Sequence, residues 1–250
     1  MQLIYFQLAK KFNVNTGYQR FNKPLLVSYP RSGTNWIRYV IEYLTQKPTP
    51  GETRLIRGNN IFYRAINGDF VIDRAHNGEF IIKKHPKVFF ILRNYKECLI
   101  RQFKTKWTDY PNIQTFLEDE SLHTPCKWYV KNIDVFNRYQ GDKKLLYFED
   151  MIENPIEFID DLVEFLNLPT KRLANLKENL TDHQKTSVGL YTKRGKESFT
   201  NGKKENLKIH SSTLSKNQLL EFDSYFTTNF PEITEKYLNR YLETQITNQK

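Results

Sequence analysis

The sequence is poor in cysteine. Its only two cysteines among 250 residues are Cys98 and Cys126, and they have neither the spacing of a metal site nor the number needed for a disulfide framework. Cys98 lies within an apolar helical pattern, which favours a role in packing. We therefore expect no metal centre, and a reducing compartment.

Long hydrophobic runs are also missing. The opening stretch, MQLIYFQLAKKF, has an apolar part too short to span a membrane, and no basic region precedes it as in a signal peptide. No later run approaches the length of a span. We therefore predict a soluble, cytoplasmic protein without a membrane-spanning segment.

Positive charge is present in excess. The net charge is +10 at pH 7, and the sequence pI is about 9.4. This balance favours an anionic ligand or partner, but a nucleotide, a nucleic acid, a membrane surface and an acidic glycan all satisfy it. A hydrophobic content of 39% suffices for a packed core, and we expect residues 1–250 to form a single domain.

Three segments share one pattern, in which an apolar strand leads into a helix. After the third strand, Asn154 and Pro155 have the residue types that begin a helix. Alternating strands and helices predict an α/β fold with a central parallel sheet, which binds ligands beyond the carboxyl ends of its strands. The three strands are expected over residues 25–27, 88–92 and 145–148.

The last part of the sequence has a different composition. Residues 192–212 contain glycines and many lysines but almost no apolar periodicity, so we expect a long surface loop. Loops of this length are usually functional or disordered. An amphipathic helix is then expected over residues 214–226.

The first strand runs into YPRSGTNW, residues 29–36. A turn at the start of a helix presents backbone N–H groups and the positive end of the helix dipole to an anion. Gly33 lets the backbone approach that anion closely, and Ser32 and Thr34 add hydroxyl donors. Arg31 adds a permanent charge that can donate two hydrogen bonds. The pattern predicts a phosphate-binding turn.

This turn is not the Walker nucleotide loop. That motif needs a glycine five residues before Gly33 and a lysine directly after it, and both are missing. A nucleotide or nucleoside kinase is therefore disfavoured, although it remains one alternative. A second alternative is a basic module without catalysis that binds a polyanion. No nucleic-acid-binding motif supports it, so we expect no nucleic acid partner.

YPRSGTNW resembles the YPKSGTxW signature of sulfotransferases that use 3′-phosphoadenosine-5′-phosphosulfate (PAPS), with Arg31 in place of the usual lysine. The resemblance implies a fold like that of P-loop NTPases. It also implies in-line transfer of the sulfuryl group of PAPS to a hydroxyl or amine of a small-molecule or carbohydrate acceptor, which leaves adenosine 3′,5′-bisphosphate (PAP). No metal is implied. The donor-binding residues that it implies in this turn are Arg31, Ser32, Gly33, Thr34, Asn35 and Trp36.

Two further segments resemble the same family. In ILRNYKECLIRQF, residues 91–103, Arg93 matches the arginine that binds the 3′-phosphate of the donor. Arg101 stands where the family has a serine, so it either replaces the hydroxyl with a charge or points into solvent. The basic loop resembles the family's RKGxxGxW segment but lacks the tryptophan. The residues at the matching places of that segment are Lys193, Arg194 and Gly195.

Sulfuryl transfer needs a base that takes the proton of the acceptor. His76, in DRAHNGEF, resembles the catalytic histidine in the THDG turn of related sulfotransferases, and we favour it as the base. His85 resembles the histidine of the KTHxP segment of other members, but it lies almost at the start of a strand, at the amino end of the sheet. Asp73 and Glu79 remain as carboxylate alternatives. Arg31 would stabilise the leaving phosphate as a cation.

The acceptor pocket is expected to come from residues 45–75 and 104–130. These stretches contain several large aromatic side chains, which fit either the hydrophobic core or an acceptor pocket, and the core is favoured. The aromatic residues in question are Trp107, Tyr110, Trp128 and Tyr129.

Overall fold

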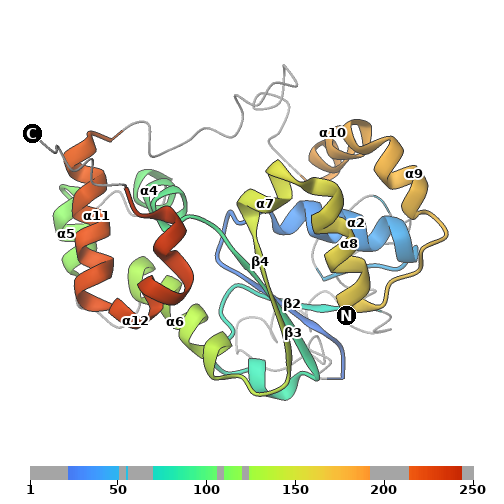
Figure 1. Ribbon diagram of the computed structural model, residues 1–250, viewed down its shortest axis with the longest axis horizontal. Coiled ribbons are helices and arrows are strands. Elements are labelled where there is room, and N and C mark those ends of the chain that lie inside the picture. Colours follow the sequence, from blue (N-terminus) through green and yellow to red (C-terminus); the bar gives the residue numbers. More distant parts are fainter. Residues whose placement is uncertain are drawn as a thin grey trace, which may run out of the picture.

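The computed structural model contains a central sheet of parallel strands, in the order β2-β1-β3-β4 within the described part of the chain (Figure 1). The predicted α/β class with a parallel sheet flanked by helices is therefore confirmed. The strands are β1 (Leu25–Ser28), β2 (Asp73–Ala75), β3 (Lys87–Leu92) and β4 (Asp142–Tyr147). The structure describes residues 22–50, 55, 70–105, 110–119, 124–191 and 214–243.

The side chains of the two central strands alternate between two hydrophobic cores. Leu25, Val27 and Phe90 belong to the core on one face of the sheet. Leu26 and Phe89 belong to the core on the other face. Because successive side chains of a strand point to opposite faces, burial on both faces requires an uninterrupted apolar run. This is why β1 and β3 were recognisable from the sequence.

The helices cover both faces of the sheet in two groups, which Figure 1 shows to either side of the strands. One group consists of α4 (Tyr95–Thr105), α5 (Ile113–Glu118), α6 (Pro125–Arg138), α11 (Lys216–Asn229) and α12 (Pro231–Ile233). The other consists of α2 (Thr34–Thr45), α7 (Phe148–Glu153), α8 (Pro155–Leu166), α9 (Leu173–Glu178) and α10 (Leu180–Tyr191). Single turns occur at η1 (Ile82–Lys84), η4 (Thr234–Leu238) and η5 (Asn239–Tyr241). Within the described ranges, no helix combines the length and the apolar character that a membrane crossing needs.

Two strands differ from the prediction. β4 begins earlier than expected, at Asp142, because it pairs with β3 along its whole length, and Phe148 already belongs to α7. β2 was not expected as a strand. It has only three residues, two of which are charged, so it gives no apolar signal. Its pairing with β1 from Leu25 to Val27 places it at the edge of the sheet.

The helix starts agree with the sequence in position. Pro155 is the first residue of α8 as predicted, but Asn154 before it makes no side-chain capping bond. The helix predicted over residues 214–226 is confirmed as α11, which begins with a capping box formed by Ser215 and Gln218. The loop predicted over residues 192–212 lies outside the described residues.

The buried side chain of Lys96 joins α4 to α11 and to Glu243. The Lys96 side chain is 1% exposed, and its Nζ lies 2.8 Å from Oδ1 of Asp223 on α11 and 3.0 Å from Oε1 of Glu243. The hydroxyl of Tyr95 also donates to Asp223. Because α4 begins two residues after Arg93, this network fixes the helix next to the predicted phosphate site.

Replacing this cation should be costly. We expect Lys96→Met to lower the free energy of unfolding by about 3–5 kcal/mol, because the buried carboxylate of Asp223 loses its counter-charge. Arg138→Ala breaks the exposed ion pair with Asp134 and serves as the control, with a loss of about 0–1 kcal/mol. Urea unfolding of both variants measures the difference, and equal losses would contradict it.

Candidate active site

The turn after β1 has an unusual backbone. Arg31 has a φ of 77° and Gly33 a φ of 76°, so two residues of the turn are in the left-handed region. Few residues other than glycine adopt this conformation, because the Cβ is crowded there. Gly33 is the N-cap residue of α2 and offers no side-chain capping bond, so the first N–H groups of the helix are available to an external acceptor. The turn thus has the geometry of an anion site.

Gly33 is required by packing as well as by backbone conformation. A Cβ on this residue would lie 2.7 Å from Cε of Met151 and 2.8 Å from Cδ2 of Phe148, both on α7. No real Cβ tolerates such contacts without a shift of its neighbours. The close approach of α7 therefore fixes the position of the turn from one side.

Both hydroxyl groups of the turn contact other side chains. The Oγ1 of Thr34 lies 2.7 Å from the Oγ of Ser28 at the end of β1. The Oγ of Ser32 lies 3.7 Å from the Sγ of Cys98 on α4. Burial raises the pKa of the Cys98 thiol to about 12, which agrees with the packing role expected for this residue. The hydroxyls thus hold the turn to β1 and α4.

The remaining side chains of the turn point in different directions. Arg31 and Asn35 are exposed, and Oδ1 of Asn35 accepts from Arg38 on the same helix. Trp36 is buried in the core and stacks on Tyr39, with ring centroids 5.5 Å apart. The structure therefore gives Trp36 a packing role, in addition to the donor contact that the resemblance implies.

Arg93 connects β3 to the turn. Its side chain is buried, and Nη1 donates a 2.6 Å hydrogen bond to the carbonyl oxygen of Arg31. The guanidinium lies 4.2 Å from the ring centroid of Phe148, and Nη2 is 3.9 Å from Oε2 of Glu97. Among the described residues, the buried Nε of Arg93 has no hydrogen-bond acceptor. An N–H group of this kind is suited to an anionic ligand.

Arg101 lies on α4 beyond Arg93 and is partly buried. Burial lowers the pKa of its guanidinium, and the nearby charges of Arg31 and Arg93 lower it further. Arg101 is thus close enough to Arg31 and Arg93 to be repelled by both charges. A bound anion would relieve this repulsion, so the arginine cluster of Arg31, Arg93 and Arg101 favours a highly charged ligand.

His76 follows β2 directly and lies at the carboxyl ends of the parallel strands, as the turn after β1 does. Its Nδ1 is 2.8 Å from the carbonyl oxygen of Ser28, the last residue of β1. A carbonyl can only accept, so Nδ1 carries a hydrogen, and Nε2 of the neutral imidazole is the basic nitrogen. The bond places the imidazole beside the start of the turn with the tautomer that a general base needs.

The other base candidates are less suitable. His85 lies before β3, at the amino end of the sheet as expected, where Nδ1 donates to the carbonyl oxygen of Lys23 at 2.9 Å. Asp73 is buried beside it, with Oδ2 3.7 Å from that nitrogen. Both are therefore at the edge opposite the turn. Glu79 forms an ion pair with Lys131 on α6.

Sequence reasoning missed Glu149, which lies in the first turn of α7. Its Oε1 accepts from the backbone N–H of Asn94 at 3.1 Å, and its Oε2 accepts from the hydroxyl of Tyr241 at 2.6 Å. It therefore fixes the residue after Arg93. The sequence did offer one signal for this residue. Glu149 comes two residues after β4, at the carboxyl ends of the strands, where ligands of parallel sheets bind.

The remaining predicted residues lie either outside the described residues or in and against the hydrophobic core. Lys193, Arg194 and Gly195 lie outside the described residues, as does Trp107. Tyr129 is buried in the core, as favoured by the sequence. Tyr110 and Trp128 pack against the same core with partly buried side chains.

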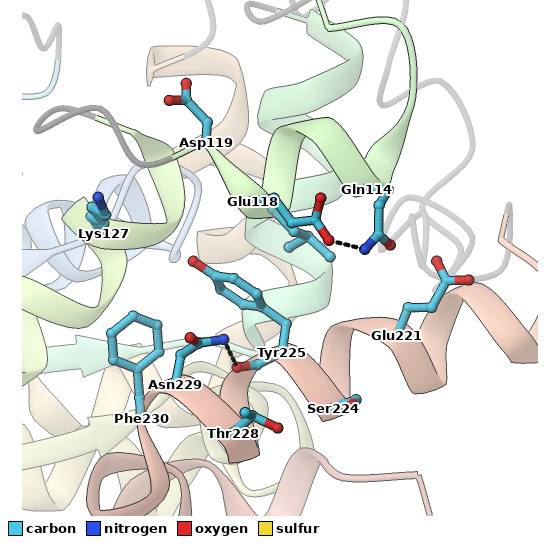
Figure 2. A pocket seen from close by; sticks show the side chains of 11 residues that line it. Gln114, Glu118, Asp119, Lys127, Glu221, Ser224, Tyr225, Thr228, Asn229 and Phe230 are labelled. Atoms are coloured by element: carbon cyan, nitrogen blue, oxygen red, sulfur yellow. Dashed lines mark hydrogen bonds between the residues drawn. The ribbon is translucent and has the colours of Figure 1, made fainter.

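A cavity of about 880 Å³ lies elsewhere, between α5, α6 and α11 (Figure 2). Its lining includes the carboxylates of Glu118, Asp119 and Glu221 but only one cation, Lys127. Gln114 donates to Glu118 within it. This balance repels phosphates, so the anionic ligand is expected at the arginine cluster and not in this cavity.

The turn should not tolerate a larger residue at position 33. We expect Gly33→Ala to lower the free energy of unfolding by about 1–2 kcal/mol from its positive φ alone, with a further loss from the contacts with α7. Thermal or urea unfolding measures this loss. Gly189→Ala on α10 is the control, because a Cβ there has open space. Equal stability of the two variants would contradict the packing described for the turn.

A solved structure of similar fold agrees with the architecture described above. A crystal structure of mouse sulfotransferase SULT7A1 complexed with PAP is 18% identical, with a TM-score of 0.59, and the match covers 90% of this chain and 88% of that chain. A crystal structure of a sulfotransferase from Alicyclobacillus acidocaldarius is also 18% identical, with a TM-score of 0.42, and covers 68% of this chain and 94% of that chain. No curated protein sequence matches the chain significantly. A family model described as a sulfotransferase domain matches residues 76–244, which is more than half of the chain, so the protein belongs to the sulfotransferase domain family.

Proposed function

We propose that this protein transfers the sulfuryl group of PAPS to a hydroxyl or amine of a small-molecule or carbohydrate acceptor and releases PAP. The observation that carries the proposal is the arginine cluster beside the start of α2, at the same edge of the sheet as His76. The mouse sulfotransferase of similar fold was crystallised with PAP, which supports this class of donor.

The residues of the site fit a ligand with two separate anionic groups. PAPS carries a phosphosulfate at its 5′ position and a phosphate at its 3′ position. The turn from Arg31 to Thr34 offers helix-start N–H groups and one guanidinium to the first group. Arg93 and Arg101 offer two guanidiniums to the second, and the buried Nε of Arg93 is suited to such an acceptor. On the resemblance alone, we assign Lys193, Arg194 and Gly195 to the second group as well.

The chemistry assigned to the protein consists of charge stabilisation and proton removal. Arg31, as a permanent cation, would stabilise the negative charge that grows on the departing phosphate. His76 would take the proton of the acceptor on Nε2, while Nδ1–H stays bonded to the carbonyl of Ser28. Binding that holds donor and acceptor in line would supply much of the rate.

Binding of PAP tests the donor site directly. At one hundred times its dissociation constant, PAP should stabilise the protein by about 2.7 kcal/mol, seen as a rise in Tm. ATP with magnesium at the same concentration is the comparison ligand and should give a smaller rise.

Arg101→Ala tests the arginine cluster in the same measurement. It should lose part of the PAP-dependent rise, because it removes one cation that repels Arg31 and Arg93 in the absence of an anion, and its Tm without ligand checks that it folds. A larger rise with ATP and magnesium would favour a kinase. No rise with either ligand would contradict the proposed donor.

Removing the base should separate turnover from binding. We expect His76→Ala to reduce sulfuryl transfer about 10²- to 10⁴-fold, while the PAP-dependent rise in Tm stays unchanged. Radiolabelled PAPS with a panel of phenol, amine and sugar acceptors measures the transfer. His85→Asn, at the opposite edge of the sheet, should keep its turnover. Full turnover in the first variant and loss in the second would reverse the assignment.

A further inference from the structure

The turn that carries His76 is held by two side chains of α6. The amide of Asn132 accepts from the backbone N–H of Gly78 at 3.0 Å and donates to the carbonyl oxygen of His76 at 2.8 Å. The indole Nε1 of Trp128 donates to the same carbonyl at 2.9 Å. Trp128 and Asn132 are four residues apart, so they lie on one face of the helix.

This arrangement restricts the backbone from the carbonyl of His76 to the N–H of Gly78. The His76 carbonyl accepts two hydrogen bonds, and the N–H of Gly78 two residues later donates a third. Asn132 is 1% exposed, so its hydrogen bonds to the turn are shielded from water. Its position needs one donor and one acceptor on the same short side chain, and the amide provides them on two separate atoms, Nδ2 and Oδ1. An alanine there would leave the His76 carbonyl and the Gly78 N–H without this partner.

The same helix also contacts the rest of the site. The ring centroid of Trp128 lies 5.3 Å from the ring centroid of Tyr29, which is at the start of the phosphate-binding turn. The hydroxyl of Tyr129 donates to the carbonyl of Arg93 at 2.6 Å. Thus α6 fixes the backbone of His76 relative to the two segments that carry the arginine cluster.

We propose that Asn132, assisted by Trp128, is a positioning residue that sets the place and the tautomer of His76 for proton removal. The inference rests on the proposed function, in which His76 is the base. When the carbonyl and the amide of the turn are held, the imidazole reaches the Ser28 carbonyl with Nδ1 and keeps Nε2 as the basic nitrogen. Without the bonds from Asn132, the His76 carbonyl and the Gly78 N–H can move. The bond from Nδ1 of His76 to the Ser28 carbonyl then weakens, and both tautomers of His76 become populated.

Steady-state kinetics give the first test. Asn132→Ala should lower kcat on the order of 10- to 100-fold, because small displacements of a reacting group have effects of this size, with KM for PAPS little changed. Trp128→Phe removes one N–H donor but keeps an aromatic ring against Tyr29, so it should fold and lose only a few-fold in kcat.

A matched control lies on the same helix. The amide oxygen of Asn137 accepts from Lys236 and Tyr237 and makes no bond with the His76 turn. Asn137→Ala therefore removes a comparable amide from α6, and it should affect stability without changing kcat. An equal loss of kcat in the variants of Asn132 and Asn137 would show a general effect of α6 and overturn the proposal.

Nitrogen NMR of the imidazole groups gives a test that needs no turnover. Neutral His76 should carry its hydrogen on Nδ1 in the wild type and shift toward the Nε2–H tautomer in Asn132→Ala. The His76→Ala spectrum identifies the signal. His85, whose Nδ1 donates to Lys23, is an internal reference that should not change. An unchanged His76 signal would overturn the proposal, even if sulfuryl transfer were confirmed.

The double variant separates action through His76 from other effects. If Asn132 acts through the base, Asn132→Ala should not lower the residual rate of His76→Ala any further. A further loss of the same size as in the wild type would overturn the proposal. If the wild type shows no sulfuryl transfer, the proposed function fails, whereas the tautomer measurement still decides whether Asn132 holds the histidine.

Discussion

The hydrogen bond from Arg93 to the carbonyl of Arg31 is the interaction on which the rest of the site depends. It joins the end of β3 to the turn after β1 and holds Arg31 in a backbone conformation that few non-glycine residues adopt. Arg93 is in turn confined by the ring of Phe148, and Glu149 binds the N–H of the next residue. Three neighbouring strands thus contribute to the shape of one short turn.

This constraint explains the unusual accumulation of charge around Arg93. One N–H of its guanidinium is already used by the turn, so the residue serves the backbone as well as any bound anion. The proposed role of Arg101 fits this situation. Arg93 divides its N–H groups between the turn and a bound anion, and Arg101, on α4, supplies a further positive charge to that anion. Arg101 is repelled by Arg31 and Arg93, and the buried ion pair of Lys96 on the same helix helps to hold Arg101 in place.

The sequence was sufficient wherever a local pattern reports on the fold. β1 and β3 are buried on both faces and therefore read as apolar runs. Gly33 marks the start of the helix after β1, and Pro155 marks the start of α8. β2 was missed because Asp73 and Arg74 give no apolar signal, and only pairing with β1 makes the segment a strand. Asn132 was missed for a related reason. A helical asparagine looks like a surface residue until tertiary structure places it against the His76 turn.

The order β2-β1-β3 places the proposed base, the phosphate-binding turn and Arg93 on three adjacent strands. The base is thus carried by the shortest of them, an edge strand that contributes few backbone hydrogen bonds of its own. Such an element cannot hold a side chain accurately by itself. The bond from His76 to Ser28 and the bonds from α6 to its backbone replace the missing rigidity. The position of the His76 side chain therefore depends more on the packing of α6 than on the strand that the residue follows.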